Sequence, residues 1–126
     1  MPPDLPVPYV LIVDDSEMVI DILSRMLTWL HVPFKTAASG REALELLEEG
    51  SFDIVMTDLL MPEMNGTELA QAIRAIPRYE KIKILAMSTE NESIMYDKHL
   101  FDKVILKPII RNALYDAIFG KTYNEE

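Results

Sequence analysis

Hydrophobic runs alternate with amphipathic stretches along most of this chain. The first run, YVLIV at residues 9–13, is continuous and β-prone, as expected for a parallel strand whose two faces are both covered. Apolar residues then recur at helical spacing, which predicts an amphipathic helix over about residues 17–30. The apolar stripe of this helix contains Val19, Ile22, Leu23, Met26, Leu27 and Leu30. Such a stripe needs a sheet to pack against.

The same alternation continues to the end of the chain. Further strands are predicted at residues 32–37, 53–57, 81–88 and 103–106. Further helices are predicted at residues 40–50, 67–76, 92–100 and about 110–118. The inward positions of the third and fifth helices include Leu69, Ala72, Ile73, Ile76, Ile110 and Leu114. Five β/α units with short links imply right-handed crossovers and an α/β fold with a doubly wound, five-stranded parallel sheet and five helices.

Composition and charge narrow the class of protein. A chain of 126 residues with 49% hydrophobic content suits one compact domain, predicted at residues 9–120 between a proline-rich lead-in (1–8) and an acidic tail (121–126). The net charge of −9 argues against direct contact with nucleic acid. No apolar run approaches the ~18 residues of a membrane span, so we expect no membrane insertion. The lack of cysteine fits a cytoplasmic protein.

Polar side chains follow four of the five predicted strands. These residues are Asp14, Asp15, Asp58, Ser88, Thr89 and Lys107. The carboxyl ends of parallel strands lie at one edge of a sheet, and ligands of doubly wound folds bind beyond that edge, where the strand order switches. We therefore expect these groups to meet in one crevice.

The residue types at this crevice suit a divalent cation and an anion. Three carboxylates in one place repel each other and raise one another's pKa unless a cation lies among them. Mg²⁺ takes carboxylate and water oxygens and keeps positions open for a phosphoryl oxygen. Lys107 would add a second positive charge, and the Ser88 hydroxyl could meet an anion when one arrives.

Each of these residues also has an ordinary structural interpretation. Asp14 and Asp15 could cap the following helix, and Asp58 could cap a loop. A strand-end hydroxyl such as that of Ser88 usually bonds to nearby backbone, and a lysine before a proline, such as Lys107, is usually solvated. Joint placement favours a functional site, because independent capping residues have no reason to converge on one crevice.

Four short motifs give the chain a resemblance to the receiver domains of two-component response regulators, from about residue 9 to residue 119. IVDDSE resembles the paired acids after the first strand, and DLLMPEMNG resembles the phosphoacceptor loop. LAMST and ILKPI carry the expected Ser/Thr and Lys-Pro positions. The resemblance implies a flavodoxin-like strand order of 2-1-3-4-5 and a cis bond before Pro108.

The resemblance also implies a role for each site residue. Asp58 would accept a phosphoryl group from a histidine kinase or a histidine phosphotransfer protein. Mg²⁺ would be bound by Asp15, Asp58 and the backbone carbonyl of Leu60, with Asp14 acting through water. Lys107 and Ser88 would contact the phosphoryl group. An output protein would bind the face formed by the helix predicted at 92–100, the last strand and the last helix.

The chain departs from the family pattern at several positions. Ile20 replaces an arginine, and Leu100-Phe101 replaces a Gly-Ala pair before the last strand. Val104 occupies the place of the switch aromatic, and its stiff branched side chain cannot supply the ring volume of that residue. Thr89 replaces a small residue. With Leu60 and Glu90, Thr89 is predicted to control how water reaches the phosphate.

These features favour a phosphorylation-dependent signalling receiver that catalyses its own phosphorylation and dephosphorylation. A receiver excised from a multidomain response regulator or hybrid kinase is an alternative source of the same sequence. A degenerate receiver that binds partners without phosphorylation is disfavoured by the intact acidic, serine and lysine positions. A phosphatase with an aspartate nucleophile is disfavoured because its Asp-x-Asp pattern after the first strand is missing here.

Overall fold

A computed structural model describes residues 7–89 and 99–120 of the chain. Its strands are β1 (Val10–Val13), β2 (Phe34–Ala37), β3 (Ile54–Asp58), β4 (Lys83–Ser88) and β5 (Lys103–Leu106). Its helices are α1 (Glu17–Trp29), α2 (Gly40–Glu49), α3 (Gly66–Arg74), the 3₁₀ helix η1 (Pro77–Tyr79) and α4 (Arg111–Phe119). Within the described ranges, no helix is long and apolar enough to cross a bilayer.

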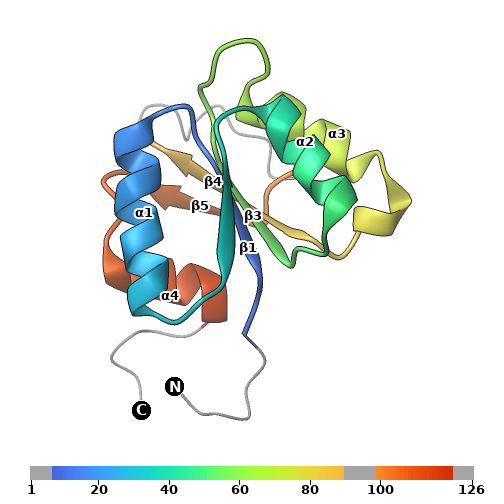
Figure 1. Cartoon of the computed structure of the whole chain (residues 1–126). Coiled ribbons are helices and arrows are strands. Elements are labelled where there is room, and N and C mark those ends of the chain that lie inside the picture. The colour runs from blue at the N-terminus through green and yellow to red at the C-terminus, as the bar shows by residue number, and fades with distance from the viewer. Residues whose placement is uncertain (1–6, 90–98, 121–126) are drawn as a thin grey trace.

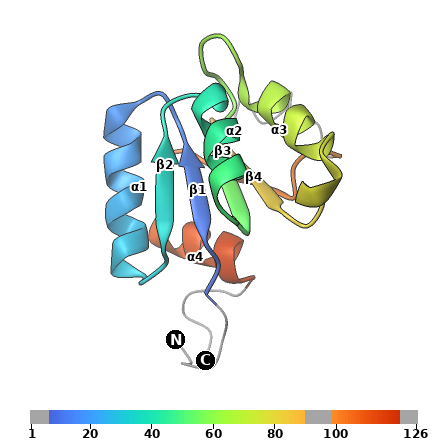
Figure 2. The ribbon, with the colours of Figure 1, turned by 45° about the vertical axis from the view of Figure 1, so that its right-hand side comes forward.

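The five strands form one parallel sheet in the order β2-β1-β3-β4-β5 (Figure 1; β2 is labelled in Figure 2). The predicted parallel sheet and its strand order are therefore confirmed. The chain passes from β1 outward to β2 and then returns to the other side of β1 as β3. The strand order reverses at this point, so the crevice at the carboxyl ends of β1 and β3 is the expected place for a ligand.

Helices cover both faces of the sheet (Figures 1 and 2). Leu23 and Leu27 of α1 and Leu114 of α4 pack with Ile12 and Met56 on one face. On the opposite face, α2 and α3 pack against side chains that include Leu11, Val13, Val55 and Ile84. Because both faces are buried, residues 10–13 and 54–56 of the inner strands are continuously apolar rather than alternating, which explains the hydrophobic runs of the sequence.

Several element boundaries differ from prediction by one or two residues; the strand predicted at 81–88, for example, begins at Lys83. Two of the differences follow from proline and from hydrogen bonding at a helix end. The strand predicted from residue 32 begins at Phe34, since the Val32 N–H still donates to the Leu27 carbonyl at the end of α1 and Pro33 has no N–H. The helix predicted over 67–76 ends at Arg74. Ile76 is extended because it precedes Pro77, which starts η1.

Some positions predicted to face inward lie at the surface. Ile22 is 45% exposed and Ile110 is 60% exposed, so both predictions are wrong. Leu23 and Leu27 occupy the centre of the contact between α1 and the sheet, which leaves Ile22 at its edge. Ile110 is the N-cap residue of α4 and precedes the turns that pack on the sheet.

The helix predicted at 92–100 falls largely on residues 90–98, outside the described part of the chain. His99 and Leu100 form a turn before Phe101, which is buried in the core beneath α2 and α3. The described residues therefore contain four α-helices and one 3₁₀ helix.

The loop between β3 and α3 is held close to the sheet at both of its ends. A side chain at Gly66 would place its Cβ 2.3 Å from the Asp58 carbonyl oxygen, so only glycine fits there. The Gly66 N–H donates to the Leu59 carbonyl over 2.9 Å. Asn65 caps α3 in a reciprocal capping box with Glu68. The Asn-Gly turn thus starts a helix and fixes the loop next to Asp58.

Candidate functional site

The residues that follow the strands lie together at the carboxyl edge of the sheet. Asp14 and Asp15 come directly after β1, and Asp58 is the last residue of β3. Ser88 is the last residue of β4, and Lys107 follows β5. Their positions follow from the topology, because five parallel strands all end at this edge.

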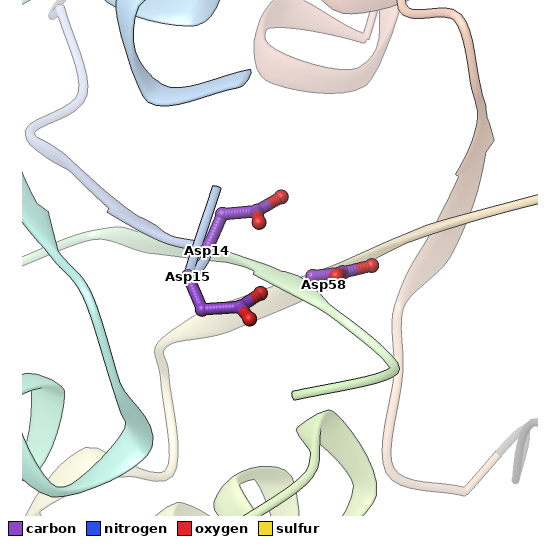
Figure 3. A group of neighbouring side chains, drawn as sticks. All are labelled: Asp14, Asp15 and Asp58. Atoms are coloured by element: carbon purple, nitrogen blue, oxygen red, sulfur yellow. The ribbon is translucent and has the colours of Figure 1, made fainter. Parts of the chain in front are cut away.

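The carboxylates of Asp14, Asp15 and Asp58 form a compact cluster. One oxygen from each lies within 4.8 Å of the others. Figure 3 shows the three side chains pointing into the same space from β1 and β3. Asp14 and Asp58 are buried, with 1% and 6% of their surface exposed, whereas Asp15 is exposed. The cluster therefore opens to solvent on the Asp15 side.

Burial raises the pKa of Asp14 above its usual range. The Ser16 backbone N–H opposes this shift by donating to Asp14 Oδ1 over 2.9 Å. The neighbouring carboxylates of Asp58 and Asp15 raise the pKa further, while Lys107 lowers it. The other oxygen, Asp14 Oδ2, is buried without a hydrogen-bond donor. The site thus holds an acid whose charge is incompletely compensated.

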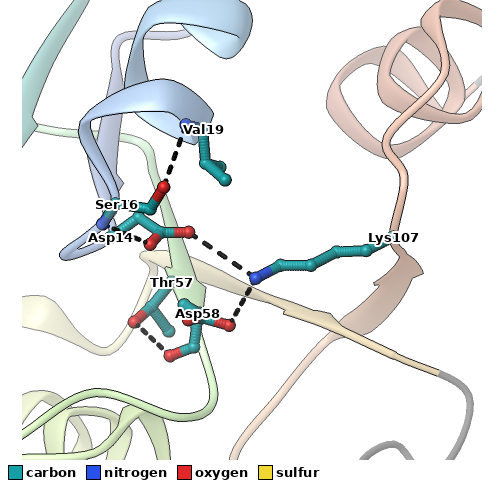
Figure 4. Close-up of polar contacts among 6 residues, drawn as sticks. All are labelled: Asp14, Ser16, Val19, Thr57, Asp58 and Lys107. Carbon is teal, nitrogen blue, oxygen red and sulfur yellow. Dashed lines mark hydrogen bonds and ion pairs between the residues drawn. The ribbon is translucent and has the colours of Figure 1, made fainter.

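Lys107, which directly follows β5, extends its side chain toward Asp58 and Asp14 (Figure 4). Its Nζ donates to Asp58 Oδ1 over 2.9 Å and lies 3.7 Å from Asp14 Oδ2. The second distance is an ion pair too long for a hydrogen bond, so Asp58 is the closer partner. The peptide bond between Lys107 and Pro108 is cis, as the resemblance implies. One ammonium group cannot neutralise three carboxylates.

Ser88 presents a buried hydroxyl without a partner. The residue has no exposed surface, and its Oγ has no hydrogen-bond partner among the described residues. Its carbonyl accepts from the Lys107 N–H over 2.8 Å, which ties the end of β4 to the residue after β5. A buried hydroxyl usually bonds to nearby backbone, so this one has capacity left for a ligand.

Helix capping by Asp14 or Asp15 and a solvated Lys107, the ordinary structural interpretations of these residues, do not agree with the structure. Ser16, rather than Asp14 or Asp15, is the N-cap of α1, and its Oγ accepts from the Val19 N–H over 3.3 Å. The Lys107 side chain is only 25% exposed and paired with acids rather than solvated. Sequence analysis did not single out Ser16 as the cap, although a serine before an apolar-periodic helix is a known signal.

The structure describes three of the four residues predicted to control switching and water access. Leu60 is 62% exposed and Thr89 is exposed, so both lie on the outer rim. Val104 pairs with Ala86 across β4 and β5 and packs, partly buried, against the core under α2 and α3. Glu90 lies outside the described residues. The three described residues of this group, Leu60, Thr89 and Val104, are uncharged.

The donor set fits a hard divalent cation. Carboxylate oxygens are the ligands that Mg²⁺ prefers, and the buried Asp14 Oδ2 has no other donor. Asp14, Asp15 and Asp58 supply acidic oxygens within the reach of one ion. Asp58 also lies beside a lysine and near a free hydroxyl, so a nucleophilic carboxylate here is surrounded by groups that bind an anion.

Comparison with known proteins agrees with this geometry. The sequence-family model for the response regulator receiver domain matches residues 10–119. The rice protein described as two-component response regulator ORR5 is 35% identical over 106 residues, which cover 81% of this chain and 79% of that protein. Among solved structures, the Vibrio cholerae chemotaxis protein CheY4 superimposes with a TM-score of 0.81 at 31% identity, covering 89% of this chain and 96% of that one.

A third relative was solved together with its partner. It is the receiver domain of the Saccharomyces cerevisiae response regulator Ssk1, in a co-crystal with the histidine phosphotransfer protein Ypd1. The similarity has a TM-score of 0.80 and 27% identity, and it covers 90% of this chain and 87% of that chain.

Proposed function

The chain belongs to the response regulator receiver domain family and acts in phosphorylation-dependent signalling, and on that premise we propose that Asp58 is its phosphoacceptor. The observation that carries this proposal is the position of the Asp58 carboxylate. It is the only carboxylate of the described cluster that lies 2.9 Å from the Lys107 ammonium and also shares a possible metal site with two further acids. The donor is a phosphohistidine on a histidine kinase or phosphotransfer protein, which the Ssk1–Ypd1 complex supports.

The transfer needs little covalent chemistry from the protein. An Asp58 oxygen attacks the phosphorus of the phosphohistidine, the donor's N–P bond breaks, and the electron pair returns to the imidazole. The product is an acyl phosphate on Asp58. Lys107 moves its ammonium group from the carboxylate to the phosphoryl oxygens, and the Ser88 hydroxyl donates to one of them. Hydrolysis of the acyl phosphate by water in the same site returns Asp58 to its free form.

Asp14, Asp15, Asp58 and the Leu60 carbonyl would hold Mg²⁺ in this site. A bound Mg²⁺ supplies positive charge that stabilises the transferring phosphoryl group. The chain's own residues orient the acceptor, with the Lys107 ammonium 2.9 Å from Asp58 Oδ1. Asp14 stays buried and anchored by the Ser16 N–H, which keeps its second oxygen directed at the cluster.

Asp15→Ala is expected to weaken Mg²⁺ binding by about tenfold or more, because it removes a carboxylate ligand from the exposed side of the cluster. The measurement is a Mg²⁺ titration of phosphorylation by a small acyl phosphate, followed by intact mass. Glu17→Ala is the matched control, since Glu17 is an exposed acid outside the cluster. An unchanged Mg²⁺ midpoint for Asp15→Ala would contradict the assignment.

The lifetime of the phosphate is expected to depend on the rim residues. Leu60→Asn and Thr89→Ala should each speed phosphate loss, because hydrolysis needs water in line with the phosphorus and both side chains restrict that approach. The decay of the phosphorylated mass after donor removal gives the rate. Leu60→Met, which keeps the apolar bulk, should decay like the unchanged protein. Equal decay in all four proteins would show that water access is controlled elsewhere.

We propose that the output protein binds the face formed by β5 and α4, and that Val104 is not the relay to it. The helix predicted at 92–100, which was expected to share this face, lies largely outside the described residues. Val104→Ala should therefore preserve the change in amide exchange over β5 and α4 on phosphorylation, because the signal passes through backbone movement at Ser88 rather than an inward aromatic. The measurement compares exchange with and without an acyl phosphate donor. A folded Val104→Ala variant that loses this response would identify Val104 as the relay.

A further inference from the structure

Thr57 is a buried polar residue that the proposed mechanism does not use. Among the described residues, the buried polar and charged side chains are those of Asp14, Asp58, Ser88 and Thr57. The first three belong to the site, whereas Thr57 has no exposed surface and its hydroxyl bonds to backbone. Burying a hydroxyl costs free energy unless the hydroxyl is hydrogen-bonded. The hydrogen bond made by the Thr57 hydroxyl therefore identifies what this residue does.

The Thr57 hydroxyl donates to the carbonyl oxygen of Asp58 over 2.9 Å (Figure 4). The ladder between β1 and β3 ends at the pair of Val13 and Thr57, one residue before Asp58. The Asp58 carbonyl therefore lies beyond the last paired position of β1. The hydroxyl of the preceding residue donates to this carbonyl where the ladder with β1 has ended.

The peptide group between Asp58 and Leu59 is thus held from both ends. Thr57 donates to its oxygen over 2.9 Å, and its N–H, which belongs to Leu59, donates to the Met87 carbonyl of β4 over 3.2 Å. Gly66 packs against the same carbonyl so closely that no side chain fits between them. The plane of this peptide is therefore set by contacts from β3, β4 and the start of α3.

We propose that Thr57 is a positioning residue for the phosphoacceptor, a role that rests on the function proposed for Asp58. The peptide that its hydroxyl fixes directly follows the Asp58 Cα and leads to Leu60, whose carbonyl is a proposed metal ligand. Its orientation therefore governs both the carboxylate that lies 2.9 Å from Lys107 and the carbonyl two residues further along. Small misplacements of a reacting group are costly in rate even when the fold is intact.

Thr57→Val tests this proposal because it keeps the size and branching of the side chain and removes only the donor. The rate of phosphorylation is measured with a small acyl phosphate at saturating Mg²⁺, over a range of donor concentrations, and corrected for the folded fraction from urea denaturation. We expect the maximal rate to fall by about tenfold with little change in the donor concentration at half-maximal rate. Thr57→Ser, which retains the hydroxyl, should restore most of the rate.

Val55→Ala is the matched control for a purely structural effect. Val55 is fully buried in β3 on the same sheet face as Thr57, and its side chain belongs to the core under α2 and α3. The variant loses stability, yet its folded fraction should react at the rate of the unchanged protein. Where Thr57→Val does not fold, Thr57→Ser and Thr57→Ala give the same comparison, because these two variants differ only in the hydroxyl.

A Thr57→Val protein that reacts at the unchanged rate, or a Val55→Ala protein that slows as much as Thr57→Val, would overturn the positioning role. Both outcomes leave the assignment of Asp58 standing. That assignment fails separately if the unchanged protein takes up no phosphate, or takes it up on a residue other than Asp58, which peptide mass analysis of the phosphorylated protein identifies.

Discussion

Asp58→Asn is expected to lower the rate of phosphorylation to less than about one-thousandth of the original. An amide is a poor nucleophile, and the substitution also removes one of the three charges that would hold the cation. Asparagine has nearly the same size and shape as aspartate, so the fold should be retained. Incubation with a small acyl phosphate and Mg²⁺, followed by intact mass, measures the effect as loss of a single phosphate adduct.

Asp21→Asn is a suitable control for this experiment. Asp21 is an exposed aspartate of α1 paired with Arg25, and it lies outside the acidic cluster. Its substitution should leave the phosphate adduct unchanged. If Asp58→Asn is phosphorylated as fast as the original protein, another residue is the acceptor and the assignment of Asp58 as phosphoacceptor is wrong.

Asp14→Asn is expected to stabilise the metal-free protein by about 1 kcal/mol, the usual cost of one buried polar group left without a donor. Asp14 Oδ2 is buried and unpartnered, and the neighbouring carboxylates repel its charge. An asparagine keeps the acceptor for the Ser16 N–H and replaces the charged oxygen with a neutral amide. The same change removes an acidic group from the metal site, so Mg²⁺ should bind more weakly.

The pH dependence of this effect has a definite sign. Burial raises the pKa of Asp14 in the folded protein above its value of 3.8 in the unfolded chain. The folded state therefore holds this proton more tightly, and the stability of the metal-free protein falls as the pH rises from 3.8 through the raised pKa. Above that pH the full penalty is present. The advantage of Asp14→Asn should thus be largest at neutral pH and shrink in acid.

Urea denaturation with a chelator and with excess Mg²⁺ tests both parts of this prediction. Mg²⁺ should stabilise the original protein more than Asp14→Asn, since stabilisation follows the affinity for the folded state. With the chelator, Asp14→Asn should have the larger free energy of unfolding. In Mg²⁺ this difference between the two proteins should therefore become smaller or change sign. Glu17→Gln removes the same charge from an exposed position and should give no gain. A destabilised Asp14→Asn protein without metal would mean that the Asp14 charge is already well compensated.

The strands and their arrangement follow from short-range pattern. Residues 10–13, 54–56 and 84–87 are all apolar, which is typical of strands buried on both faces, and the helices between them require parallel crossovers. Helix boundaries were less predictable. They depend on single events such as the Val32 N–H returning to Leu27 or the extended conformation that Pro77 imposes on Ile76.

The position of the site could also be predicted, because the ends of parallel strands place its residues at one edge of the sheet. The burial and the hydrogen-bond partners of each residue could not be predicted. Asp14 and Asp15 are neighbours in the sequence, yet one is buried with a raised pKa and the other is exposed. The hydroxyl of Thr57 gave no signal in the sequence, since its importance depends on where the β1 ladder ends.

The sequence by itself determined the alternation of strands and helices, the apolar faces, and the chemical groups available at the strand ends. These properties depend on the periodicity of neighbouring residues. The tertiary structure decided which apolar residues, such as Ile22 and Ile110, remain exposed, and which polar atoms are left unpartnered. It also placed Lys107 at 2.9 Å from Asp58, 49 residues away in the chain. Burial and electrostatics depend on the segments that pack from elsewhere in the chain, and no local pattern encodes those distances.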